Sequence, residues 1–198
     1  MIRWKGVVGL ALLLILFVFV GERAYAAEGS QGTPIQAGKV GLLVSPPITG
    51  TTRIGLAFHA HESFAIKPSV AFSYSRVAYR GPDQDSYSQL ALGVGFDGYF
   101  GISQSLYGYG GALFEYSRLV ETEEFDGFED KFTGNFLSVV PRIGLQYMPA
   151  SQFGLYGEVG LATTFGKVTS EEEGLEDEEI AIFQFTTQAA IGVLFYVN

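Results

Sequence analysis

Residues 183–197 alternate between two kinds of side chain over most of their length, and this pattern restricts the fold more than any other feature of the sequence. A helix repeats its apolar residues every three or four positions, whereas a strand places successive side chains on opposite faces. One face carries Phe183, Phe185, Thr187, Ala189, Ile191, Val193, Phe195 and Val197, and the other carries Gln184, Thr186, Gln188, Ala190 and Gly192. Residues 88–100 and 136–147 show the same division. The chain is therefore predicted to form long strands with two unlike faces.

Reading the whole chain in this way predicts eight strands, and the connections between them alternate in length. The strands are expected near residues 38–45, 52–60, 64–79, 87–100, 105–119, 134–148, 153–168 and 180–197. Connections near 60–64, 101–104 and 149–152 are short, those near 80–86, 120–133 and 169–179 are longer and polar, and SPPITG is a short exception. Short turns at one end and longer loops at the other are typical of an outer-membrane barrel. The predicted fold class is all-β, an eight-stranded antiparallel up-and-down transmembrane β-barrel.

The direction of the apolar faces separates this prediction from a soluble, lipocalin-like barrel, which would show the same alternation. The polar faces are rich in Gly, Ala, Gln and Thr, whereas a surface in water usually carries dense Lys and Glu. Small residues suit the crowded interior of an eight-stranded barrel. Aromatic residues lie near the inferred strand ends, as in an interfacial girdle: Tyr79, Tyr87, Phe100, Tyr107, Tyr147 and Phe153. These features favour apolar faces that point outward into lipid.

The N-terminus has the layout of a cleavable signal peptide. Arg3 and Lys5 precede an apolar run from Val7 to Val20, and Ala24-Tyr25-Ala26 forms a small-residue cleavage site. The run is shorter than the roughly 20 residues that a spanning helix needs. The predicted organisation is a signal peptide at 1–26, a periplasmic N-terminal segment at 27–37 and one barrel domain at 38–198. The chain has no cysteine, so disulfides, thiolate metal sites and lipoprotein-type acylation are excluded.

The net charge of −9 is concentrated in two segments. The first contains Glu121, Glu123, Glu124, Asp126, Glu129 and Asp130, and the second contains Glu171, Glu172, Glu173, Glu176, Asp177, Glu178 and Glu179. This sign of charge excludes a nucleic-acid partner. Clustered carboxylates can bind divalent cations such as Ca²⁺, although neither segment has EF-hand spacing. A solvated anionic surface is the simpler interpretation.

Two local features conflict with regular strands. Pro68 and Pro141 lie inside predicted strands, where a missing N–H donor requires a bulge or a shifted boundary. In YGYGGALFEYSR the apolar residues change parity between Tyr109 and Phe114. A bulge near Gly110 and Gly111 is predicted to absorb this change.

The chain resembles the small eight-stranded outer-membrane β-barrel superfamily, which includes the transmembrane domain of outer-membrane protein A and the opacity proteins. The resemblance lies in the signal peptide, the hairpin LGVGFDGYFGISQSLYGYGGALFEYSR and the alternating C-terminal strand. It implies an outer-membrane location with both termini in the periplasm, and contacts with outer-membrane lipids, lipopolysaccharide and the barrel-assembly machinery. One departure is the ending Phe195-Tyr196-Val197-Asn198, where such chains usually end in an aromatic residue.

Membership of such a superfamily leaves function open, because similar barrels serve as anchors, adhesins, narrow channels or lipid-modifying enzymes. His61-Glu62-Ser63 matches the His-x-Ser pair of outer-membrane lipid A deacylases. However, it falls in a predicted periplasmic turn, whereas that family acts on the outer leaflet. The expectation is therefore a non-enzymatic protein with no catalytic residues, no cofactor and no assigned metal ligands. Its predicted role is structural or in surface interactions through the acidic loops, and a deacylase-like enzyme or an ion-leaky channel is the alternative.

Charges within the strands predict a filled lumen. Arg142 and Glu158 lie symmetrically about Ala150, so a turn centred there would place them directly opposite one another inside the barrel. The same register would pair Gly144 with Tyr156 and, on the lipid side, Leu145 with Leu155 and Tyr147 with Phe153. Arg53, Asp97 and Tyr156 are predicted to lie in the lumen as well. An eight-stranded barrel leaves room for little more than these side chains, so the lumen is expected to be occluded.

Overall fold

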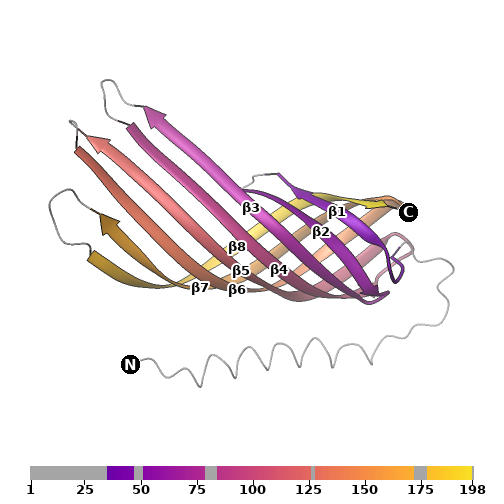
Figure 1. The fold of residues 1–198 in the computed structure, drawn as a ribbon. Helices are drawn as coiled ribbons and strands as arrows, with labels where there is room; N and C mark the ends of the chain where they lie inside the picture. Colours follow the sequence, from indigo (N-terminus) through magenta and orange to yellow (C-terminus); the bar gives the residue numbers. More distant parts are fainter. Residues whose placement is uncertain (1–34, 47–50, 79–83, 126–127, 172–177, 198) are drawn as a thin grey trace, which may run out of the picture.

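The structure is a computed structural model that describes residues 35–46, 51–78, 84–125, 128–171 and 178–197, and these residues form one closed antiparallel barrel (Figure 1). Its strands are β1 (Val40–Ser45), β2 (Thr52–His61), β3 (Phe64–Ala78), β4 (Gln84–Gly101), β5 (Leu106–Phe125), β6 (Phe128–Ala150), β7 (Phe153–Glu171) and β8 (Glu178–Val197). Each strand pairs with the next, and β8 pairs with β1. The predicted eight-stranded up-and-down barrel is confirmed. Within the described ranges no helix is long and apolar enough to cross a membrane. The predicted signal peptide lies outside the described residues.

The barrel wall is much taller on one side than on the other. β1 has 6 residues and β8 has 20, and they pair only from Val40–Val44 to Val193–Val197. The β2–β3 ladder ends where Thr52 faces Phe72. Beyond that level the described strands β3 to β8 continue as a curved sheet. Figure 1 shows the ends of β3, β5 and β7 and the starts of β4, β6 and β8 at one end of the barrel, here called the hairpin end, and the end of β8 at the other, the turn end.

The strands extend into segments that were predicted to be acidic loops. β5 continues to Phe125 and β6 begins at Phe128, so most of the predicted loop 120–133 is strand. The β5–β6 ladder runs unbroken through these residues, and Glu121 faces Phe132. The prediction was wrong because it gave weight to the acidic residues, whereas Val120, Thr122 and Phe132 keep the strand alternation. Asp126 and residues 172–177 lie outside the described residues.

The predicted bulge at Gly110 and Gly111 is absent from the described ladders. Both neighbours of β5 keep a constant register from Tyr107 to Phe114. Tyr107 and Tyr109 are buried inside the barrel, at 5% and 1% exposure, whereas Phe114 and Tyr116 face outward. The parity of the apolar residues changes because aromatic residues occupy both faces, not because the strand slips. Tyr107 is therefore not part of the predicted interfacial girdle.

The two prolines are accommodated without any change of register. The β2–β3 ladder passes from Gly55↔Ser69 to Phe58↔Ile66 across Pro68. The β6–β7 ladder likewise passes from Val139↔Thr163 to Arg142↔Gly160 across Pro141. On its other side each proline stays in register with β4 or β5. The prediction of bulges or shifted boundaries was wrong, because each proline interrupts pairing with only one of its two neighbours.

The outer wall is apolar on every strand. Its exposed large residues include Leu42, Leu56, Phe72, Leu92, Phe96, Phe114, Tyr116, Leu137, Ile143, Leu145, Leu155, Leu161, Phe185, Ile191 and Phe195. Phe100 and Tyr147 of the predicted girdle are exposed near the turn end and Phe153 is half-buried, while Tyr87 is half-buried and Tyr79 lies outside the described residues. A continuous apolar surface of this extent is unfavourable in water and is what a lipid-facing wall requires.

Candidate functional site

Four charged side chains form a network across the middle of the barrel interior. Arg142 on β6 donates from Nε to Asp97 Oδ1 at 3.1 Å and from one terminal nitrogen to Asp97 Oδ2 at 2.9 Å. Its other terminal nitrogen lies 3.1 Å from Glu158 Oε1 on β7. Lys67 Nζ on β3 lies 2.8 Å from Asp97 Oδ2, and Tyr109 on β5 donates to Glu158 Oε2 at 2.8 Å. The network therefore connects five strands, β3 to β7.

Arg142 and Glu158 meet diagonally and not face to face. The structure pairs Arg142 with Gly160 and Glu158 with Gly144, so the predicted register is wrong by two residues. The same correction applies to the other predicted pairs: Leu145 faces Gly157, Gln146 faces Tyr156 and Tyr147 faces Leu155. The cause is local, because β6 extends to Ala150 and the ladder is irregular between Tyr147 and Ala150.

Glycines on the inner face make room for the large polar side chains. A Cβ at Gly95 would lie 2.3 Å from a terminal nitrogen of Arg142, and one at Gly144 would lie 2.4 Å from the ring of Tyr109. Neither position tolerates a side chain unless its neighbour moves. At these two positions the small residue and its bulky neighbour fill the interior together.

Toward the turn end the interior is filled by a tyrosine cluster, which consists of the buried residues Tyr99, Tyr107, Tyr109, Tyr156 and Tyr196 together with His59, Gln146 and Met148. His59 Nε2 lies 2.8 Å from the Tyr196 hydroxyl. Tyr99 donates to Gln146 Oε1 at 3.2 Å, and Gln146 Nε2 donates to Tyr196 at 3.2 Å. Ile35, from the predicted periplasmic segment, is buried against this cluster.

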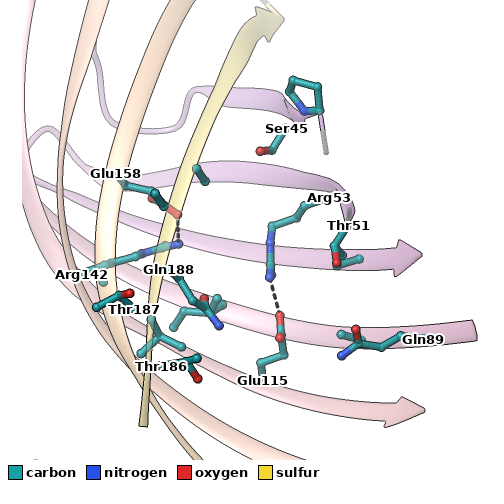
Figure 2. A pocket seen from close by; sticks show the side chains of 18 residues that line it. Ser45, Thr51, Arg53, Gln89, Glu115, Arg142, Glu158, Thr186, Thr187 and Gln188 are labelled. Atoms are coloured by element: carbon teal, nitrogen blue, oxygen red, sulfur yellow. Dashed lines mark hydrogen bonds and ion pairs between the residues drawn. The ribbon is translucent and has the colours of Figure 1, made fainter. Parts of the chain in front are cut away.

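Toward the hairpin end the interior opens into a cavity of about 270 Å³. Arg142 and Glu158 line it on one side, and Arg53 and Glu115, which approach within 2.6 Å, line it on another (Figure 2). Its remaining lining is mostly uncharged: Ser45, Pro46, Thr51, Ala71, Gln89, Ala91, Leu113, Val140, Gly160, Thr186, Thr187, Gln188, Ala189 and Ala190. The cavity can hold water or a small polar molecule, but its charged groups are already paired with one another.

A solved structure shares this fold. A major outer membrane protein from Thermus thermophilus matches with a TM-score of 0.50 at 10% identity, over 80% of this chain and 98% of that one. The chain has the fold of an outer-membrane barrel protein. Acinetobacter baumannii CarO2 (TM-score 0.40, 14% identity, 80% and 97% covered) and CarO (0.40, 12%, 84% and 100%) also match. No protein-family model and no curated protein sequence matches the chain.

All five residues predicted for the lumen lie on the inward faces of the barrel strands. Arg142, Glu158 and Asp97 share one network, Arg53 pairs separately with Glu115, and Tyr156 belongs to the tyrosine cluster. Sequence reasoning missed Lys67, Glu115 and Tyr109. Lys67 and Glu115 have the same parity as buried Ala65 and Leu113, so extending the alternation would have placed both inside. Tyr109 was missed because it was counted as an apolar residue.

The histidine and serine of HAHES lie close together in the β2–β3 turn. His61 Nδ1 lies 2.9 Å from Ser63 Oγ, and the Ser63 backbone N–H donates to the same nitrogen at 3.2 Å. Both contacts are exposed at the turn end and are typical of a polar turn. Within the described ranges no group of three or more His, Asp and Glu side chains is placed to hold a metal ion.

Proposed function

We propose that the protein is an integral outer-membrane barrel without enzymatic activity, which presents acidic hairpins at the cell surface and does not conduct ions or solutes freely. The observation that carries this proposal is the packing of the lumen, where the tyrosine cluster and the Arg142 network follow one another along the barrel. Eight strands leave an interior that side chains can fill completely. The barrel then acts as an anchor, and its activity lies in the segments that project from it.

The outer wall supports the membrane location. Its apolar residues are exposed on all eight strands, and strands of 15 to 23 residues in β3 to β8 exceed the roughly 9 to 11 that cross a bilayer. The excess length lies at the hairpin end (Figure 1). Short turns face the periplasm in barrels of this kind, so the turn end and both termini are assigned to the periplasm.

The acidic hairpins are assigned to surface interactions. Glu121, Glu123, Asp130 and Glu178 lie at the hairpin end in the described strands. A surface of this sign repels anionic partners and attracts cationic ones, including divalent cations that bridge lipopolysaccharide phosphates. Deleting residues 121–130 tests whether the hairpins recognise a partner or support the structure of the envelope. Loss of a binding phenotype with normal assembly supports recognition, whereas loss of envelope integrity supports a structural role.

Planar-bilayer recording of the refolded barrel tests occlusion directly. The expected result is no large, stable conductance from the native chain. The double variant Tyr99→Ala/Tyr109→Ala is the matched control, because it removes two rings from the cluster and should introduce a measurable leak. A large conductance from the native protein would overturn the anchor proposal in favour of a channel.

The contact between His61 and Ser63 is the observation that favours the deacylase-like alternative. An assay of fatty-acid release from lipid A, with native protein and with Ser63→Ala, decides between the two. The proposal expects no release from either protein. Release by the native chain that Ser63→Ala abolishes would establish the enzyme.

A further inference from the structure

A row of basic and amide side chains crosses three adjacent strands on the outside of the barrel. Arg118 on β5 faces Asn135 on β6, and Asn135 faces Lys167 on β7. All three side chains are exposed, and the Lys167 side chain is 64% accessible. Ser117 next to Arg118 is buried, so Arg118 occupies the outward side of its strand. These three residues are called the basic row.

The basic row borders directly on the apolar wall. One alternation step closer to the turn end, Tyr116, Leu137 and Phe165 form the corresponding row across the same strands. Tyr116 and Leu137 are exposed, and the Tyr116 hydroxyl donates to Asn135 Oδ1 at 2.8 Å. Lipid headgroups lie at such a boundary, where an apolar band gives way to polar side chains.

The outer face of this part of the barrel carries acidic as well as basic side chains. The alternation of β5 places Glu121 and Glu123 on the inward side with Glu115, and that of β6 places Asp130 inward and Lys131 outward. The outward carboxylates Glu171 and Glu179 contact Lys131 and Lys167. Among the described residues Arg118 makes no ion pair, so its guanidinium remains available to an anion.

We propose that the basic row binds a phosphate group of a phosphorylated lipid in the outer leaflet. The Arg118 guanidinium can bind phosphate oxygens through two parallel hydrogen bonds, and the Asn135 amide can donate a further contact. The Lys167 ammonium, which also contacts Glu179, adds a positive charge beside them. The acyl chains of the same lipid lie against Tyr116, Leu137 and Phe165. Although the chain has a net charge of −9, its outer face thus presents Arg118 and Lys167 at the level where anionic headgroups lie.

This inference rests on the proposed outer-membrane location, and the experiment separates the two. The barrel is refolded into phosphatidylcholine nanodiscs that contain either bis-phosphorylated lipid A or the same lipid without its phosphates, and bound lipid is counted by native mass spectrometry. Failure of the barrel to insert into either nanodisc contradicts the membrane location. Insertion with equal retention of both lipids contradicts only the phosphate site.

The expected result is several-fold stronger retention of the phosphorylated lipid by the native chain. Arg118→Gln and Lys167→Gln should each weaken it by about five-fold. Arg76→Gln is the matched control, because it removes an exposed base from β3, outside the basic row, and should leave retention unchanged. Equal losses in all three variants would indicate diffuse electrostatic attraction and overturn the proposal, as would full displacement of the lipid by millimolar inorganic phosphate.

Discussion

The turn half and the hairpin half of the barrel share the same strands, but their interiors are filled differently. In the turn half, the tyrosine cluster and the Arg142 network bury nearly every inward side chain. In the hairpin half, the inward residues beside the cavity are mostly small or neutral polar, and the Arg53–Glu115 pair is partly exposed. The alternation of the strands builds the wall in both halves. The size and charge of the inward residues decide how each half is stabilised.

The largest loss of stability is expected from Asp97→Ala in the turn half. Asp97 is fully buried and is contacted by both Lys67 and Arg142, so its removal leaves two buried cations short of a partner. Breaking a buried pair in this way costs about 3–5 kcal/mol. Urea unfolding of the refolded barrel, followed by its shift in gel mobility, measures the loss. A cost below that of the hairpin-half variants would contradict the contrast between the halves.

The next effect concerns coupling within the network. Arg142→Ala removes contacts to both Asp97 and Glu158, whereas Glu158→Ala removes one of them, so the arginine variant should be the less stable of the two. The double variant should lose less than the sum of the single losses, by about 0.5–3 kcal/mol. Strictly additive losses in the same unfolding assay would show that the pair is not coupled.

A smaller loss of about 1–3 kcal/mol is expected from Gly95→Val, because the new side chain would overlap the guanidinium of Arg142. Gly101→Val is the matched control, since an added Cβ at Gly101 meets no atom within 4 Å. Comparison of the two unfolding midpoints isolates the packing effect from the general effect of valine in a strand. Equal midpoints would indicate that the interior around Arg142 is loosely packed.

The smallest effects are expected in the hairpin half. Glu115→Gln weakens a pair with Arg53 that lies next to the cavity, where solvent screens the charges, and should cost about 1 kcal/mol or less. Lys131→Gln breaks a pair whose side chains are 42% and 49% exposed, and its cost should not be measurable. A cost for Glu115→Gln equal to that of Asp97→Ala would remove the distinction between the two halves.

The sequence predicted which residues face inward better than it predicted which of them meet. Alternation alone places Arg142, Glu158 and Asp97 in the lumen, because each follows the polar parity of its strand. The contact between Asp97 and Arg142 joins β4 to β6, strands that are not neighbours, so it depends on closure of the barrel. A single hairpin carries no information about such a contact.

The errors of register and parity have two physical causes. The pairing of β6 with β7 depends on the irregularity between Tyr147 and Ala150, which is a matter of backbone geometry and leaves no clear pattern in the side chains. Tyr107 was placed in the interfacial girdle, and a bulge was predicted because Tyr109 and Phe114 were both counted as apolar residues. Inside this barrel tyrosine fills space and its hydroxyl finds a polar partner, as Tyr109 does with Glu158, so polarity alone does not predict its face.

The position of the tyrosine cluster determines where a small molecule can lie inside the barrel. The cluster fills the turn end, whereas the 270 Å³ cavity lies toward the hairpin end, so the two halves offer a small molecule unequal room. A small molecule held in the cavity would lie on the hairpin side of the tyrosine cluster, next to the Arg142–Glu158 and Arg53–Glu115 pairs.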